Sequence, residues 1–229
     1  MTDVASMAAR PKTTTDPKAI VRDGYDRASL AYRGDDYDLE KSGYGYWLRR
    51  LARLVPPGGR VLDLGCGCGV PVARELAKRH AVTGIDLSPV QIERARRLVP
   101  EAEFVCGDMT AAEFPPGSFD LVVAFYSIIN VLLAEQPGLM QRVASWLAPR
   151  GVFLAVVGKV AGAWAEPDFR GVPGVTMYWS HADLGAARGW LAEARLDIVE
   201  EGTQPRHGEP GFAVLIARRL AASSTIRAS

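Results

Sequence analysis

From residue 60 onward, short apolar runs alternate with segments whose apolar residues recur every three or four positions. Runs bounded by Gly, Pro and Asp are typical of strands, whereas the wider spacing indicates amphipathic helices. The expected strands are 60–64, 81–85, 103–106, 119–124, 151–157, 197–200 and 212–217. The expected helices are 70–80, 89–99, 128–133, 138–147 and 182–194.

This alternation predicts an α/β fold with a mostly parallel sheet of seven strands and helices on both faces. The last two expected strands, 197–200 and 212–217, follow one another without a helix between them. A hairpin therefore joins them, and we expect the last strand to run antiparallel to its neighbour.

The residues before the first strand divide into two parts. Residues 1–17 are small, polar and contain prolines, so we expect a flexible tail. Residues 18–54 contain two amphipathic patterns and form a predicted helical cap, which Pro56-Pro57-Gly58-Gly59 ends. The domain that carries the sheet then spans 55–220, and we expect a single domain overall.

The first expected strand runs directly into Gly65-Cys66-Gly67-Cys68-Gly69, and Asp63 stands two residues before the first glycine. A strand, a tight glycine turn and a helix present backbone to a ligand at the edge of an open α/β sheet. The dinucleotide pattern G-x-G-x-x-G needs Gly where the chain has Val70. Asp63 instead suits a ligand that ends in an amino acid, because its carboxylate can accept from an ammonium group.

Acidic residues follow the next two strands. Asp86 lies 21 residues after Gly65, about the spacing at which an acid accepts from both ribose hydroxyls. A helix cap is the alternative role, but Ser88 before Pro89 already supplies one and leaves Asp86 free. After the third strand come Gly107-Asp108-Met109, where a carboxylate beside a thioether suits an adenine ring.

The pattern D-x-G-x-G-x-G resembles motif I of the class I S-adenosylmethionine (SAM)-dependent methyltransferases. The resemblance covers roughly residues 55–219 and implies a Rossmann-like sheet, SAM as cofactor and S-adenosylhomocysteine as product. The expected cofactor-binding residues are Asp63, Gly65, Cys66, Gly67, Gly69, Asp86, Leu87, Gly107, Asp108, Met109, Phe125, Tyr25 and Tyr32.

Two further stretches are similar to a bacterial subfamily of small-molecule methyltransferases. They are Phe-Tyr-Ser-Ile-Ile-Asn-Val, from Phe125, and Met-Tyr-Trp-Ser-His-Ala-Asp, from Met177. Members of that subfamily often carry His where Asn130 stands, and often a Gly-Gly-His element where this chain has Arg206-His207-Gly208. A reaction that uses those histidines is therefore performed differently here, or on another substrate.

Aromatic residues are candidates for excluding water from methyl transfer and for facing a cationic sulfonium. Tyr25 and Tyr32 lie on one stripe of the first expected helix, so they are lid residues, core residues or both. Tyr126 follows the fourth strand near the expected sulfonium position. Apolar residues in 158–177 do not recur at the spacing of a helix or a strand, which indicates a loop. A loop of this length is commonly a lid or a binding element.

Four residues are candidates for catalysis, His181, His207, Asn130 and Tyr126, and the sequence also leaves open that neither histidine acts. Ser180 and Asp183 resemble a capping box, which places His181 in the first turn of a helix that keeps it neutral. His207 belongs to the final hairpin loop. Asn130, four residues after Tyr126, shares a helical face with it if that segment is helical, and orients the acceptor or satisfies backbone.

The amino-acid composition limits the classes of partner that this protein is expected to bind. The 27 Lys and Arg residues balance 26 Asp and Glu residues, which argues against nucleic acid as a partner. Arg94, Arg96 and Arg97 are expected to form a solvated helix face. Apolar runs of membrane-spanning length and a signal peptide are missing, and three cysteines fit a reducing cytoplasm. We expect no metal and a monomer or homodimer.

The sequence thus favours SAM-dependent methyl transfer to a small organic acceptor, apolar or aromatic, at N, O or C. A secondary metabolite is one such acceptor. The alternatives are a SAM-fold protein that performs a non-methylating reaction such as cyclisation, and a non-catalytic SAM-binding module. An NAD-dependent oxidoreductase is disfavoured by the glycine spacing.

Overall fold

Strand β1 (Arg60–Leu64) lies inside a seven-stranded sheet, and four of its five residues are buried. The computed structural model describes residues 16–37, 39, 43–206 and 209–220. The strand order is β3-β2-β1-β4-β5-β9-β8. The other strands are β2 (Ala81–Asp86), β3 (Glu103–Cys106), β4 (Phe119–Ala124), β5 (Leu147–Val157), β8 (Leu196–Arg206) and β9 (Glu209–Arg219).

All neighbouring strands pair in parallel except at β9, which is antiparallel to both β5 and β8. The predicted mostly parallel sheet and its closing hairpin are therefore confirmed. The hairpin strands are longer than the apolar runs indicate, because β8 and β9 continue to pair beyond them, from Leu196 opposite Arg219 to Arg206 opposite Glu209.

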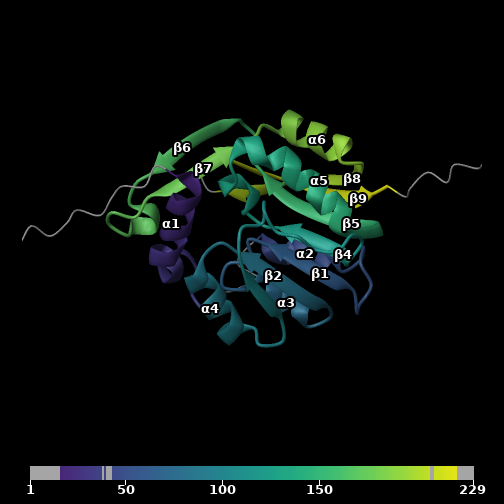
Figure 1. Ribbon diagram of the computed structural model, residues 1–229, viewed down its shortest axis with the longest axis horizontal. Helices are drawn as coiled ribbons and strands as arrows, with labels where there is room; N and C mark the ends of the chain where they lie inside the picture. The colour runs from purple at the N-terminus through teal and green to yellow at the C-terminus, as the bar shows by residue number, and fades with distance from the viewer. Residues whose placement is uncertain (1–15, 38, 40–42, 207–208, 221–229) are drawn as a thin grey trace, which may run out of the picture.

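The sheet separates two apolar clusters, as Figure 1 shows by the helices above and below it. Successive residues of β4 alternate between them: Leu121 and Val123 join one cluster, and Val122 and Ala124 join the other. The first cluster is completed by α1 (Pro17–Tyr32), α2 (Tyr44–Leu51), α3 (Val72–Ala77) and α4 (Pro89–Leu98). The second is completed by α5 (Gln136–Trp146) and α6 (Leu184–Glu193).

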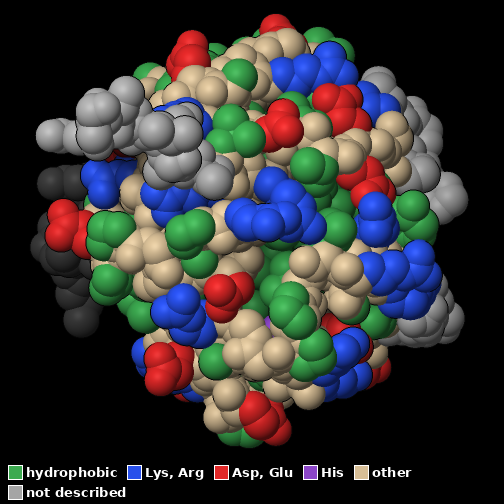
Figure 2. Space-filling model, turned by 90° about the vertical axis from the view of Figure 1, so that its right-hand side faces the viewer, with side chains coloured by type: hydrophobic (Ala, Val, Ile, Leu, Met, Phe, Trp, Pro, Cys, Tyr) green, Lys and Arg blue, Asp and Glu red, His purple; other side chains and the backbone are tan. Residues whose placement is uncertain are grey.

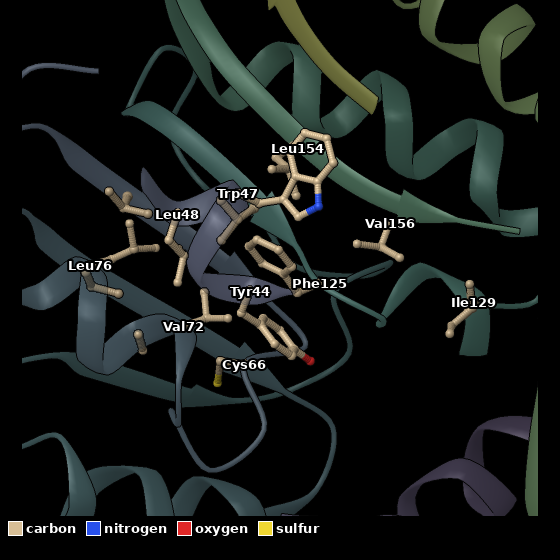
Figure 3. Packing of buried hydrophobic residues seen from close by; sticks show 14 of the residues in the cluster. Tyr44, Trp47, Leu48, Cys66, Val72, Leu76, Phe125, Ile129, Leu154 and Val156 are labelled. Carbon is tan, nitrogen blue, oxygen red and sulfur yellow. The ribbon is translucent and has the colours of Figure 1, made fainter. Parts of the chain in front are cut away.

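The cap helix α2 packs its aromatic side chains onto the sheet. Figure 3 shows Tyr44 and Trp47 projecting from α2 toward Phe125, and the Tyr44 and Phe125 ring centroids lie 5.1 Å apart. Trp47 also covers Gly202 of β8, where a Cβ would lie 2.2 Å from the indole ring. The cap is thus part of the same core as the sheet.

The cap helix α1 is fixed to α4 by a buried arginine. Asp16 caps α1 by accepting from the Lys18 N–H at 3.1 Å, and Pro17 starts its first turn. Arg94 donates to the Ser29 hydroxyl at 2.7 Å and pairs with Asp35 at 2.5 Å. The expected solvated arginine face is therefore wrong at Arg94, which is 7% exposed because residues of the cap enclose it.

The segment 158–177, expected as an aperiodic loop, contributes to a separate two-stranded sheet. Strand β6 (Gly162–Glu166) pairs antiparallel with β7 (Met177–His181), and this hairpin lies beside α1 in Figure 1. Short 3₁₀ helices complete the chain: η1 (Ile128–Asn130), η2 (Leu133–Glu135) and η3 (Phe169–Gly171). Five-residue strands of mixed polarity leave little periodicity in the sequence, which explains why the pattern missed them.

On the face drawn in Figure 2, basic and acidic side chains are interspersed. Within the described ranges, no helix combines the length and the apolar content that crossing a membrane requires. The predicted tail 1–17 lies almost entirely outside the described residues, which begin at Asp16.

Candidate functional site

A cleft of about 80 Å³ lies at the carboxyl ends of β1, β2 and β4, beneath α1. We call it the first cleft. The structure brings twelve of the predicted site residues to its lining: Tyr25, Tyr32, Gly65, Gly67, Asp86, Leu87, Gly107, Asp108, Met109, Phe125, Tyr126 and Asn130. Because parallel strands end at one edge of the sheet, loops far apart in sequence meet there.

A smaller cavity adjoins the first cleft, and we call it the inner pocket. Both are lined by Tyr32, Gly65, Gly67 and Phe125, whereas Asp63 and Cys66 line the inner pocket alone. Burial raises the pKa of the Cys66 thiol well above its usual range, so this side chain is an uncharged wall.

Asp63 is the buried acid of this pocket. It is 2% exposed, and its Oδ2 has no hydrogen-bond partner among the described residues. Burial, reinforced by the charge of Asp86, raises the pKa of Asp63 to about 8. A buried carboxylate oxygen without a donor is costly, and a cationic group bound in the pocket would compensate it.

Asp86 holds the glycine turn in place. Its Oδ2 accepts from the Gly67 N–H at 2.8 Å, and its Oδ1 accepts from the Ser88 N–H at 2.9 Å. Ser88 caps α4 as predicted, accepting from the Gln91 N–H at 3.1 Å, but Asp86 is not left free of other bonds. Burial raises the pKa of Asp86 to about 6, and each carboxylate oxygen can still accept a second bond from a ligand.

The three glycines of the turn differ in what a side chain at each position would contact. A Cβ at Gly65 would lie 2.3 Å from Ser127 Cβ, so glycine is needed there for packing. Gly67 has a φ of +55°, and its Cβ position is open. Gly69 faces Val99 and Phe104 and lines neither the first cleft nor the inner pocket. The structure therefore does not bring Gly69 into the site.

Asp108 has a partner that sequence reasoning missed. Lys18 Nζ lies 2.6 Å from Asp108 Oδ2 and 2.8 Å from Glu135 Oε1, which joins the start of α1 to the opposite rim of the first cleft. Although partial burial opposes both charges, the mutual attraction lowers the pKa of Asp108 and raises that of Lys18. No local pattern marks Lys18, because its partners lie 90 residues or more away.

Arg33 is a second residue that the sequence did not single out. It lines the inner pocket together with Asp63, and its Nη2 donates to the Tyr44 hydroxyl at 3.1 Å. Its guanidinium carbon lies 3.8 Å from the centroid of the Tyr37 ring. The inner pocket thus presents a guanidinium and a carboxylate, which are complementary to a zwitterionic amino acid group.

The side chains of Tyr25, Tyr126 and Asn130 connect the cap to the site. Tyr25 donates to Asn130 Oδ1 at 3.1 Å, and Asn130 Nδ2 donates to the Tyr178 carbonyl at 2.8 Å. Tyr126 has a φ of +57° and precedes η1, so it does not share a helical face with Asn130 as expected. Both side chains nevertheless line the first cleft.

Of the two predicted histidines, only His181 belongs to the described residues, and it does not line the first cleft. Asp183 alone caps α6, accepting from the Ala186 N–H at 2.8 Å, so the predicted capping box is wrong. His181 instead ends strand β7, where it lines a separate cavity of about 530 Å³ beside the β6–β7 hairpin. We call this the hairpin cavity. His207 lies outside the described residues.

Residues 61–151 match the family model described as a methyltransferase domain. The chain is 35% identical over 199 residues to a 2-methyl-6-phytyl-1,4-hydroquinone methyltransferase of Synechocystis sp., covering 77% of this chain and 60% of the relative. It spans between 43% and 60% of the length of the first three curated relatives.

Two solved structures have the same fold. A magnesium protoporphyrin IX methyltransferase of Synechocystis PCC 6803 with bound SAM superposes with a TM-score of 0.67 at 19% identity, covering 90% of this chain and 99% of that one. The [4+2]-cyclase SpnF superposes with a TM-score of 0.65 at 20% identity, covering 86% and 94%. The family model thus shows that residues 61–151 are similar to a methyltransferase domain, and the two solved structures show that the described chain shares their fold.

Proposed function

We propose that this protein transfers the methyl group of SAM to a small organic acceptor. The observation that carries the proposal is the continuous lining of the inner pocket and the first cleft. Arg33 and Asp63 line the inner pocket, and Asp86 and Asp108 line the adjoining first cleft. These charges are complementary to an amino acid, a ribose and an adenine joined in one ligand.

In this proposal each group of the cofactor has a named partner. The Asp63 carboxylate accepts from the ammonium, and the Arg33 guanidinium binds the carboxylate. Asp86 accepts from ribose hydroxyls while keeping the Gly67 N–H in place. Asp108 accepts from the adenine amine, and Met109 covers the ring.

Bound SAM supplies an electrophilic methyl group, and its transfer to an acceptor atom leaves S-adenosylhomocysteine. The chain contributes alignment and exclusion of water, which are the main requirements of an in-line displacement. Tyr25 and Tyr32 lie edge-to-face with centroids 5.0 Å apart and cover the first cleft from α1. Their rings and that of Tyr126 exclude solvent and present π-electrons to a sulfonium.

The first test is calorimetric titration of the protein with S-adenosylhomocysteine, with NAD as the control ligand. Micromolar binding of S-adenosylhomocysteine and none of NAD is the expected result. Incubation with SAM and candidate acceptors then tests transfer, because a methylated product gains the mass of one methylene. A converted product of unchanged mass would support the cyclisation alternative, and preference for NAD would refute the proposal.

A further inference from the structure

Four aromatic side chains line the hairpin cavity, together with the charged residues Lys159 and Glu166 and with glycines and small apolar residues. Trp164 and Trp179 lie on paired positions of β6 and β7 with centroids 6.3 Å apart and planes inclined by 28°. His181 stands edge-on to Trp164 at 4.8 Å, and Phe212 of β9 lies 5.6 Å from His181. At about 530 Å³, the cavity has the size of a small-molecule site, which is typically about 300–1,000 Å³.

One wall of this cavity is exposed to solvent although it is a large apolar ring. Trp164 is 46% exposed, whereas Trp179 and Phe212 are 6% and 7% exposed. The Trp164 ring stacks on Trp179 and leaves nearly half of its own surface open to solvent. A flat apolar ligand that covers this ring removes apolar surface from water, which favours binding.

The cavity also contains a fixed hydrogen-bond acceptor. Glu166 Oε2 accepts from the Trp179 Nε1–H at 2.8 Å, which orients the carboxylate within the lining. Its other oxygen can accept from a hydroxyl or amine of a ligand. Among apolar walls, one oriented polar group fixes the position of a ligand and provides specificity.

Aromatic contacts connect the hairpin cavity to the first cleft. Phe212 lines the hairpin cavity, Tyr126 lines the first cleft, and their ring centroids lie 5.3 Å apart at 89°. On the other side, Trp179 contacts Phe169 at 6.0 Å, and Phe169 contacts Tyr25 at 5.9 Å. The two cavities are therefore connected by two rings in contact on one side, Phe212 and Tyr126, and by three on the other.

We propose that the hairpin cavity is the acceptor subsite, and that it takes a flat aromatic molecule with a hydroxyl or amine at its edge. This inference rests on the proposed function, because it places the acceptor beside the cofactor residues. The ring lies against Trp164, the donor bonds Glu166, and the reacting edge points past Phe212 toward Tyr126. His181 lies where it can contact the acceptor.

The test is binding of three matched probes, measured by calorimetry and by quenching of tryptophan fluorescence, without SAM. The probes are 2-naphthol, decahydro-2-naphthol, which has the same skeleton without flatness, and 2-methoxynaphthalene, which lacks the donor. We expect 2-naphthol to bind at least about tenfold more tightly than either of the others. Equal affinity for all three, or no binding of 2-naphthol, would overturn the proposal.

Variants locate the binding. Trp164→Ala should weaken 2-naphthol binding about tenfold, and Trp164→Phe, which keeps a flat ring, should restore most of it. Glu166→Gln should reduce the preference for 2-naphthol over 2-methoxynaphthalene. Tyr46→Ala removes an exposed ring of α2 and is the matched control, with unchanged affinity expected.

Titration with S-adenosylhomocysteine separates the two proposals. If all variants bind S-adenosylhomocysteine normally and Trp164→Ala still binds 2-naphthol normally, the subsite is refuted while the cofactor site stands. If the wild type does not bind S-adenosylhomocysteine, the proposed function fails first. Tryptophan emission can also be followed as the protein concentration is raised without ligand. A change that Trp164→Ala abolishes would assign this surface to contact with a second copy of the chain, and would refute the subsite.

Discussion

At the scale of single residues, the acids of the site differ in what surrounds them. Asp63 is buried without a donor, Asp86 accepts from two backbone N–H groups, and Asp108 is paired with Lys18. Burial raises the pKa of Asp63 to about 8, and burial raises that of Asp86 to about 6 although its N–H bonds oppose the rise. Partial burial also opposes the charge of Asp108, but its bonds to Lys18 lower its pKa. The sequence identified all three acids from their positions after strands, but their partners come from distant segments.

The raised pKa of Asp63 predicts how cofactor binding depends on pH. Below about pH 8 the carboxyl is mostly protonated and cannot pair with an ammonium group, so binding must release its proton. The affinity for S-adenosylhomocysteine should therefore rise between pH 6.5 and 8, by up to about tenfold per pH unit. Calorimetry across that range, repeated on Asp63→Asn, checks it. An equal slope in the variant would contradict the assignment.

Removal of the Asp86 side chain should weaken cofactor binding in two ways. Asp86→Ala loses the ribose acceptor and releases the Gly67 N–H, so we expect a loss of roughly 2–4 kcal/mol in S-adenosylhomocysteine binding. Asp120→Ala is the matched control, because Asp120 lies on β4 and bonds Arg60 outside both cavities. Comparable affinity for both variants would remove Asp86 from the cofactor site.

At the scale of elements, α1 is held over the first cleft by apolar packing and by hydrogen bonds to several elements, including Ser88 to Asp26 and Arg27 to the Gly174 carbonyl. Lys18 joins it to the rim, Tyr25 joins it to Asn130, and Arg94 joins its last turns to α4. The Lys18 pair is partly exposed, so it contributes at most about 1 kcal/mol.

Loss of the Lys18 ion pair should accelerate exchange of the bound nucleoside. Since Asp108 is freed and α1 is held less firmly, Lys18→Met should dissociate S-adenosylhomocysteine up to about fivefold faster. Stopped-flow fluorescence measures this rate. Lys78→Met, which breaks the exposed ion pair with Glu75 on α3, is the control and should leave the rate unchanged. Identical rates in both variants would mean that the Lys18 contact does not restrain the cap.

The elements that the sequence predicted are those whose signal is local. The glycine turn after β1, the Ser88 cap of α4 and the closing hairpin each depend on neighbouring residues. The β6–β7 hairpin depends on pairing between Trp164 and Trp179, 15 positions apart, and Arg94 is buried by Asp35, 59 positions away. Ser180 and Asp183 both suit a cap, and only packing decides which one begins the helix.

At the scale of the whole molecule, the residues proposed to bind the cofactor come from both the cap and the sheet. Arg33 follows α1, Asp63 ends β1, and both line one pocket. A ligand in this pocket therefore binds the folded chain and not the unfolded one, and it stabilises the fold as a unit.

Thermal unfolding should report this linkage. At 100 times its dissociation constant, S-adenosylhomocysteine should add about 2.7 kcal/mol to the free energy of unfolding. For a chain of this size, that corresponds to a rise in Tm of roughly 5–11 °C. Differential scanning calorimetry with S-adenosylhomocysteine and with NAD provides the comparison. No rise with S-adenosylhomocysteine would show that it does not bind the folded protein at this concentration.

The position of α1 has a consequence for the order of events in turnover. The first cleft, at about 80 Å³, is smaller than the roughly 300 Å³ of a typical ligand site, and residues of α1 line it, so we expect α1 to move when a nucleoside enters or leaves. Lifting α1 also withdraws Tyr25 from Phe169, whose ring supports Trp179. The residence times of the two ligands are therefore linked, and we expect solvent viscosity, which slows the helix, to slow the catalytic cycle.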